Sequence, residues 1–260
     1  MSLYINSDED HFRITYDSIM SQTFLPNQIV IVFDGPVKFN VDKLLNKQTI
    51  QHDIVRLDKN KGLSIALNEG LKIIKNDYVF RVDTDDILTP DRFQIQYEFM
   101  SNNDDVAILG GQMNFIGDNG KPLNIFKNVP LTNYSIRKFI LFKNPFNHPT
   151  VVYRKSIIDL VGGYDHVQYY EDWYLWWKIS KIPDVKFVNL QNKIVHYRVR
   201  SLTERSGTRF LKFEFLFYKK LYDNKFINIW IFIIIIMIKL PIKIMPKFVF
   251  LQAKKIYSKI

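Results

Sequence analysis

The sequence predicts an α/β protein built on a doubly wound, mostly parallel sheet. Short, β-branched apolar runs alternate with amphipathic segments through the first two-thirds of the 260-residue chain. This spacing is typical of strand–helix–strand units, and 47% hydrophobic with 24% charged residues is the composition of a protein that buries a core. After about Asn144 the alternation becomes irregular, which indicates a second half that closes over the edge of the sheet.

Four expected strands are short, β-branched and apolar, as buried parallel strands should be: Gln28–Phe33, Asp53–Leu57, Tyr78–Val82 and Val106–Gly110. In the irregular second half we expect a strand around His148–Tyr153 and one or two strands within Lys186–Tyr197.

The expected helices carry their apolar residues on one face. They cover roughly Asp10–Gln22, Val41–Lys47, Leu63–Lys75 and the aromatic-rich segment Tyr170–Lys181. A further helix follows Asp86, with Thr89 as its N-cap and Pro90 at its first helical position.

The net charge of +10 is concentrated in the last quarter of the chain. Residues 193–260 contain 15 Lys and Arg against 3 Asp and Glu, whereas residues 1–192 contain 21 against 23. Such asymmetry indicates an anionic partner surface. Nucleic acid is not expected, because the aromatic residues of this tail are not interleaved with arginine as a base-stacking surface requires.

The tail contains the apolar run Phe226–Ile238, broken only by Asn228. This run is shorter than the ~20 residues that span a bilayer. We expect an interfacial helical anchor, with apolar side chains in the lipid and lysines at anionic headgroups. A buried core helix with solvated lysines is the alternative.

The chain has no cysteine, which excludes a disulfide framework, thiolate catalysis and metal sites built on sulfur, and fits a reducing cytoplasm. We expect no secretory signal, because the first residues turn acidic before an apolar segment could form. No P-loop, G-x-G-x-x-G turn or nucleophile elbow is present.

Three carboxylates follow the predicted strand Tyr78–Val82. In an extended chain Asp83 and Asp85 would point to the same side. Ligands of open α/β sheets bind at the carboxyl ends of the strands, and paired carboxylates suit Mg²⁺ or Mn²⁺ shared with a diphosphate. The alternative is a solvated acidic turn ahead of a helix.

A second acidic pair, Glu171 and Asp172, lies within the aromatic stretch 169–177. Tyr and Trp faces are platforms for sugar rings, and a partly desolvated carboxylate beside them can act as a general base. The alternative is an N-terminal acid on a core helix.

Three weaker signals accompany these acids. The turn Asp34–Pro36 ends a strand, and the segment Asn60–Ser64 leads into a helix N-terminus, where backbone N–H groups can meet phosphate or ribose. His148 and His196 are isolated histidines that are either structural or ligand-binding.

Taken in order and spacing, these stretches resemble glycosyltransferase family 2, the inverting enzymes of GT-A fold, and within it the bacterial capsule, O-antigen and amylovoran-type branch. The resemblance covers most of residues 1–210. Its matching stretches are Ser18-Ile19, Gln22-Thr23, Pro26, Ile29–Pro36, Asn60–Leu63, Ala66–Gly70, Arg81–Ile87, His148–Thr150, Gly162–Tyr164 and Glu171-Asp172.

The resemblance implies a role for each matching acid. Asp34 is expected to contact the uridine of a nucleotide sugar, and Asp86 to lie next to the sugar. Asp85, with Asp83, is expected to hold Mn²⁺ or Mg²⁺ against the donor diphosphate. Asp172 is expected to be the catalytic base, oriented by Glu171. The remaining implied contacts are Tyr4, Asn60, Gly62 and Arg81 for the donor, and His148 and Trp173 for the acceptor.

The resemblance also implies the reaction. A hexose, glucose or galactose, would pass from a UDP-sugar to a polyprenyl-diphosphate-linked saccharide, with a β-1,3 bond to GlcNAc-diphosphoundecaprenol as the specific expectation. The protein would act peripherally at the cytoplasmic face of the bacterial inner membrane. Residues 1–210 would form the GT-A domain, with a donor half to about 112 and an acceptor half over 113–210, and residues 211–260 the basic, apolar helical tail.

Two alternatives stay open. A sugar nucleotidyltransferase would need a Gly-rich, basic triphosphate loop near the N-terminus, which the sequence lacks. A catalytically impaired, membrane-bound nucleotide-sugar-binding or scaffold protein is suggested by the first strand, which begins at Met1–Tyr4 and is shorter than the family's.

Overall fold

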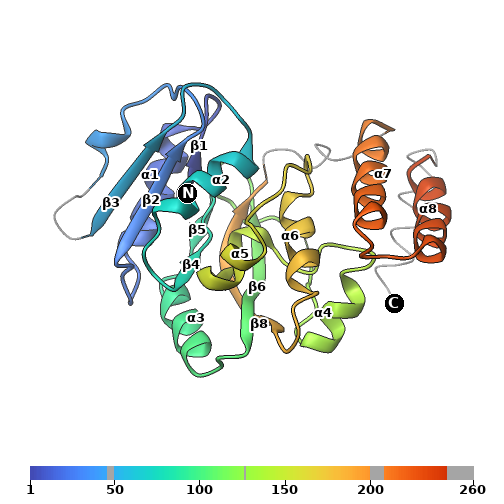
Figure 1. Cartoon of the computed structure of the whole chain (residues 1–260). Coiled ribbons are helices and arrows are strands. Elements are labelled where there is room, and N and C mark those ends of the chain that lie inside the picture. The colour runs from blue at the N-terminus through green and yellow to red at the C-terminus, as the bar shows by residue number, and fades with distance from the viewer. Residues whose placement is uncertain (46–49, 126, 200–207, 245–260) are drawn as a thin grey trace. The chain divides into compact units, whose positions relative to one another are not determined.

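The chain divides into two units, and the larger unit contains two β-sheets (Figure 1). The larger unit comprises residues 1–166 and 171–200, and the second unit residues 167–170 and 201–260. This computed structural model describes residues 1–45, 50–125, 127–199 and 208–244.

The strands are β1 (Ser2–Leu3), β2 (Gln28–Phe33), β3 (Gln51–Arg56), β4 (Tyr78–Phe80), β5 (Ile87–Leu88), β6 (Val106–Ile116), β7 (Val152–Arg154) and β8 (Lys186–Arg198). The α-helices are α1 (Glu9–Met20), α2 (Leu63–Ile73), α3 (Arg92–Ser101), α4 (Asn133–Phe139), α5 (Lys155–Leu160), α6 (Glu171–Ile179), α7 (Thr208–Asp223) and α8 (Ile229–Ile244).

The first sheet is parallel and has the order β1-β2-β3. Its β2 coincides with the predicted strand, because a run of six residues rich in Ile and Val favours a strand covered on both faces. Asp8 caps α1 by accepting a hydrogen bond from the His11 N–H at 2.9 Å. Phe12 and Ile31 are buried in the core between this helix and the sheet.

The second sheet is mixed and has the order β4-β7-β6-β8-β5. Only β6 and β8 pair in parallel, and they lie side by side in Figure 1. The pairings β4–β7, β7–β6 and β8–β5 are antiparallel. The mostly parallel arrangement predicted from the alternation therefore holds for the first sheet, whereas the irregular second half contributes the antiparallel strands.

The strand predicted around His148–Tyr153 is wrong in its first half. His148–Thr150 form a 3₁₀ turn, and β7 begins at Val152. Pro149 has no N–H for a ladder, and the Thr150 hydroxyl donates to the Asn147 carbonyl at 2.7 Å, which closes the turn.

Two predicted helix starts also need correction. The helix after the acidic segment begins at Arg92 rather than Pro90, because the Thr89 hydroxyl donates to the Ile194 carbonyl of β8 instead of capping a helix. The segment predicted as a helix from Val41 is a 3₁₀ helix over Val41–Lys43, and the end of that prediction lies outside the described residues.

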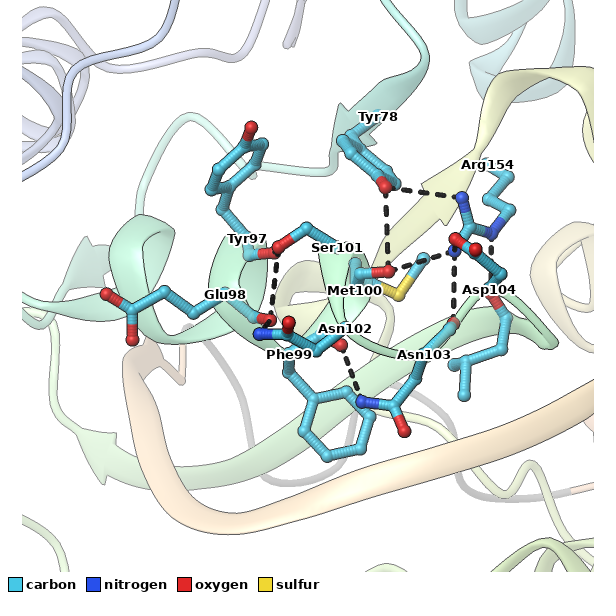
Figure 2. Close-up of polar contacts among 11 residues, drawn as sticks. Tyr78, Tyr97, Glu98, Phe99, Met100, Ser101, Asn102, Asn103, Asp104 and Arg154 are labelled. Atoms are coloured by element: carbon cyan, nitrogen blue, oxygen red, sulfur yellow. Dashed lines mark hydrogen bonds and ion pairs between the residues drawn. The ribbon is translucent and has the colours of Figure 1, made fainter.

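Arg154, at the end of β7, closes the C-terminus of α3 (Figure 2). Its guanidinium donates to the carbonyls of Met100 at 2.9 Å and Asn103 at 3.0 Å, and to the Tyr78 hydroxyl at 3.2 Å. The Met100 carbonyl belongs to the last turn of α3, at the negative end of the helix dipole, and Asn103 lies two residues beyond the helix end, so a cation stabilises this terminus. Arg154 thereby ties α3 to the second sheet.

The second unit contains the pair α7 and α8. Phe217 and Leu221 of α7 and Ile235 of α8 are buried, and Phe232 of α8 packs against Phe215 and Tyr222 of α7. Glu214 and Lys239 form an ion pair of 2.6 Å that joins the two helices. Among the described residues no helix is both long and apolar enough to span a bilayer.

The tail prediction is confirmed as helical over the part that the structure describes. The helix α8 begins at Ile229, within the apolar run Phe226–Ile238, where the Asn228 carboxamide accepts a hydrogen bond from the Ile231 N–H at 2.9 Å. Residues 245–260 lie outside the described residues.

Candidate active site

The carboxyl ends of β2 and β3 meet the N-terminus of α2. Asp34, which directly follows β2, accepts hydrogen bonds from the backbone N–H groups of Lys61 at 2.6 Å and Gly62 at 3.0 Å. These N–H groups belong to the positive end of α2, which favours a carboxylate. Asn60 is exposed beside this cluster.

This arrangement changes the expectation for Asp34. Its side chain is only 4% exposed and both of its oxygens are engaged by the backbone. Asp34 therefore holds the loop before α2 in place. The loop that it holds, with Asn60 exposed and Gly62 at the helix start, is the part that a ligand can reach. Tyr4 is also exposed, directly after β1.

The acidic segment lies in a turn and not in a strand. β4 ends at Phe80, so the alternation expected for Asp83 and Asp85 in an extended chain does not apply. Arg81 is buried, and its guanidinium donates to the Asp83 carboxylate and to the Val82 carbonyl. Burial acts to raise the pKa of Asp83, but the positive charges of Arg81 and His148 hold that pKa below its ordinary value, so Asp83 is ionised.

Asp86 has a different environment. Burial, and then the charges of Asp83 and Asp85, raise the pKa of Asp86 well above its ordinary value, which favours the neutral carboxyl group. Its Oδ1 accepts from the Arg198 N–H at 2.9 Å, and its side chain is 1% exposed. Asp86 therefore anchors the turn in this structure, and its contact with a sugar stays a prediction.

The guanidinium groups of two buried arginines donate hydrogen bonds to backbone carbonyls of the acidic segment. Arg198 donates from Nε to the Asp85 carbonyl at 2.9 Å. Arg92 is fully buried and donates to the Arg81 carbonyl at 2.8 Å. Burial lowers the pKa of Arg92 to about 9. These two side chains therefore fix the acidic turn through its own backbone carbonyls, at Arg81 and at Asp85.

The acids that remain suit a cation bound together with a ligand. Asp83 and Asp85 are half-buried, whereas Asp86 is not accessible. Within the described residues no three His, Cys, Asp or Glu side chains group as a metal site. Two carboxylates leave most of the coordination sphere to phosphate oxygens and water, which is the usual arrangement for Mg²⁺ and for similar hard cations.

His148 interacts with groups on both sides of the candidate site. It contributes electrostatically to the lowered pKa of Asp83, and its Nε2 lies 3.0 Å from the Tyr164 hydroxyl. The charge of Asp172 in turn contributes to the raised pKa of Tyr164, whose first cause is burial. Electrostatic interactions therefore run from Asp83 through His148 and Tyr164 to Asp172 within one unit of the protein.

Asp172 is half-buried in the first turn of α6. Its Oδ2 accepts from the Asn144 amide at 2.6 Å, and its Oδ1 from the Trp173 N–H at 2.7 Å. Glu171 precedes it and is also half-buried. The two hydrogen bonds fix the Asp172 carboxylate, which is what a base requires.

The aromatic residues around this pair do not form one exposed wall. Trp173 is 4% exposed, and its indole N–H donates to the Ile140 carbonyl at 2.8 Å. Trp176 is fully buried. Tyr169 and Tyr170 belong to the second unit, where their rings pack against phenylalanines of α7. The predicted sugar platform is therefore core packing in this structure, because the apolar face of α6 points inward.

A cavity of about 330 Å³ lies elsewhere in the larger unit, between β2 and β4, with Met1, Gln28, Gly70 and Tyr78 among its lining residues. None of the acids at 83–86 or 171–172 lines it. It adjoins β1, which pairs only with Val32 and Phe33 of β2, as the short first strand predicts.

The chain matches the family model of glycosyl transferase family 2 over residues 4–161. The chain belongs to glycosyltransferase family 2. It is a glycosyltransferase of GT-A fold, as the sequence predicts.

Bacterial relatives agree with this assignment. An uncharacterised glycosyltransferase of Haemophilus influenzae is 38% identical over 85% of this chain and 84% of its own length. The amylovoran biosynthesis glycosyltransferase AmsE of Erwinia amylovora is 34% identical over 84% and 83%. The UDP-Gal:α-D-GlcNAc-diphosphoundecaprenol β-1,3-galactosyltransferase of Escherichia coli is 32% identical over 95% and 90%.

Solved structures share the fold of this family 2 protein. TarS 1–349 of S. aureus, in complex with UDP-GlcNAc, superposes with a TM-score of 0.64 at 18% identity, covering 85% of this chain and 65% of TarS 1–349. A mannosyltransferase of Pyrobaculum calidifontis, in complex with GDP-Man and Mn²⁺, superposes with a TM-score of 0.54 at 12% identity, covering 74% and 53%.

Sequence reasoning missed the groups that hold the site together. Arg92, Asn144 and Arg198 gave no signal, because single polar residues acquire partners only in the fold. Tyr164 was noted only within the Gly162–Tyr164 stretch. Arg92 begins α3, a helix that contains several other polar residues, so the sequence did not single it out.

Proposed function

We propose that this family 2 glycosyltransferase transfers a hexose from a UDP-sugar to a lipid-diphosphate-linked saccharide with inversion at the anomeric carbon. The observation that carries the proposal is the electrostatic connection of the acidic turn to Asp172 through His148 and Tyr164. It supports one site that contains both a cation-binding acidic turn and a positioned base. The N-terminal 210 residues are the proposed catalytic domain.

The roles of the acids follow from their environments. The Asp172 carboxylate takes the proton of the acceptor hydroxyl while that oxygen attacks the anomeric carbon. The bond from the anomeric carbon to the diphosphate breaks in the same displacement, so an α-linked donor gives a β-linked product. Glu171, next to Asp172, is the proposed orienting group.

The donor diphosphate is proposed to lie at the acidic turn. Asp85 and the ionised Asp83 would hold Mn²⁺ or Mg²⁺, which neutralises charge on the leaving diphosphate. Arg81 keeps Asp83 in place. The exposed groups at the carboxyl ends of β1 and β3, Tyr4 and Asn60, with Gly62 at the start of α2, are the proposed nucleoside contacts.

Galactose or glucose is the proposed donor sugar, and GlcNAc-diphosphoundecaprenol the proposed acceptor with a β-1,3 bond. Support comes from the E. coli relative, whose name states this galactosyl transfer and which matches over most of both chains. His148, which interacts with groups on both sides of the candidate site, is the proposed acceptor contact.

The helix α8 is proposed to hold the protein at the cytoplasmic face of the inner membrane. Trp230, Ile234 and Met237 are 72%, 52% and 71% exposed and lie on one face at helical spacing. Contiguous exposed apolar side chains of this kind mark an interaction surface, and the basic tail sequence suits anionic lipid.

A membrane-bound nucleotide-sugar-binding protein without transferase activity is the second candidate. The short β1 and the cavity beside it favour this candidate, because they leave the sheet next to the proposed nucleotide site less supported.

The test is transfer of labelled sugar from UDP-galactose and UDP-glucose to synthetic GlcNAc-diphospho-lipid, with Mn²⁺ present and with EDTA added. We expect EDTA-sensitive transfer and UDP release. Turnover that is indifferent to EDTA would contradict the cation site. Calorimetric UDP binding without turnover would favour the second candidate.

A further inference from the structure

Tyr164 is held through its backbone by a side chain from the donor half. The Asn68 amide of α2 donates from Nδ2 to the Tyr164 carbonyl at 2.8 Å and accepts from the Tyr164 N–H on Oδ1 at 2.8 Å. The single carboxamide of Asn68 thus pairs with both backbone polar groups of Tyr164, in the way that a neighbouring β-strand would. Asn68 and Tyr164 are 96 residues apart in sequence.

Gly163 makes this clamp possible. Its backbone has φ +70°, a conformation that costs residues with a side chain energy. A Cβ at this position would lie 2.5 Å from the Asn68 Oδ1. A residue with a side chain would therefore push the carboxamide out of its place against Tyr164.

The other end of Tyr164 meets His148. The phenol oxygen lies 3.0 Å from His148 Nε2, and the two rings pack with centroids 5.7 Å apart. The phenol is also hydrogen-bonded to Tyr153. Burial is the first cause that raises the pKa of Tyr164 well above its ordinary value, so the phenol stays protonated and keeps both hydrogen bonds at neutral pH.

We propose that Tyr164, clamped by Asn68, is a positioning residue that sets the ring orientation and the protonated nitrogen of His148. A hydrogen bond to one imidazole nitrogen determines the tautomer and the direction of the ring. His148 interacts with groups on both sides of the candidate site, so its position affects the reacting groups from both substrates. This inference rests on the proposed function, because His148 is there the acceptor contact.

The variant Tyr164→Phe tests the proposal, because it removes the hydroxyl and keeps the ring. We expect kcat to fall by about 10- to 100-fold, since displacement of a positioned group by about 1 Å has effects of this size. The affinity for UDP should stay within about threefold, because Tyr164 contacts no proposed donor group.

A double-variant cycle separates positioning from packing. His148→Asn should lower kcat by a similar factor, and Tyr164→Phe with His148→Asn should be no slower than His148→Asn alone, because the hydroxyl acts through the imidazole. If the two substitutions lowered kcat independently, the double variant would show the product of the two single losses, and that result would overturn the proposal.

Tyr78→Phe is the matched control. The Tyr78 phenol is half-buried and, like that of Tyr164, hydrogen-bonded, here to Arg154 and Met100, but it belongs to the cap of α3 (Figure 2). We expect it to lower the free energy of unfolding and to leave kcat unchanged. Equal kcat losses in Tyr78→Phe and Tyr164→Phe would assign both to general destabilisation and contradict the proposal.

The ¹⁵N resonances of the His148 imidazole give a readout that needs no turnover. In Tyr164→Phe we expect the Nε2 signal to shift and the ratio of the two tautomers to change, whereas Tyr78→Phe should leave both as in the wild type. Unchanged His148 signals in Tyr164→Phe would overturn the positioning role. Absence of transfer in the wild type would instead count against the proposed function, and the resonance test would still stand.

Discussion

Asp83 and Asp86 are three residues apart, and their pKa values shift in opposite directions. Asp83 has a buried guanidinium beside it, whereas Asp86 has burial and two neighbouring carboxyl groups acting against its ionisation. Their burial and neighbours, and not their shared residue type, decide which acid can bind a cation.

Substitutions should distinguish the two acids. We expect Asp86→Asn to change the free energy of unfolding by less than about 1 kcal/mol, because a neutral carboxamide can still accept from the Arg198 N–H. Asp86→Ala should cost about 1–3 kcal/mol, since it leaves a buried donor unpaired. Urea unfolding measures both. A large loss in Asp86→Asn would show that the carboxyl is ionised.

Asp172→Asn tests the base. We expect transfer to fall by at least about 100-fold, the smaller end of the contribution of general base catalysis. UDP-sugar affinity, measured by calorimetry, should not change, because Asp172 lies in α6, away from the donor contacts at Tyr4 and Asn60. An active Asp172→Asn enzyme would refute the assignment.

Among the elements, α3 depends on a side chain from a strand that follows it by about fifty residues. Arg154 satisfies carbonyls at the end of α3, and α3 supplies Arg92, which supports the acidic turn.

Arg154→Met should lower the free energy of unfolding by about 2–4 kcal/mol, because hydrogen bonds from a charged donor are worth about 1.5–3 kcal/mol and several are lost together. Arg13→Met is the control. Arg13 is half-exposed and only ion-paired on the surface of α1, so its loss should cost less than about 0.5 kcal/mol. Similar losses in both variants would argue against the cap.

At the scale of the whole molecule, the proposed membrane anchor makes the activity depend on a surface outside the larger unit. The variant Trp230→Ser with Met237→Ser should reduce binding to anionic vesicles by at least about tenfold, since each large apolar side chain that enters the lipid contributes about 1.5–3 kcal/mol. Vesicle flotation measures it. Leu160→Ser is the control, because Leu160 is 70% exposed but belongs to the larger unit. Equal binding by both variants would remove α8 as the anchor.

Local patterns in the sequence were enough to predict the parallel sheet, the helices α1 and α2, the two acidic stretches and the family. A strand such as β2 or an amphipathic helix such as α2 is specified by near neighbours, so a window of a few residues contains the information. The clustering of acids at the ends of strands likewise follows from the order of elements.

Only the tertiary structure decided which of those acids are accessible to a ligand. Asp34 and Asp86 are engaged by backbone groups of Gly62 and Arg198, and Trp173 is buried, although their residue types favour ligand binding. The clamp of Asn68 on Tyr164 joins residues 96 positions apart. Burial and hydrogen-bond partners depend on contacts between distant segments, and a linear pattern does not contain those contacts until the chain has folded.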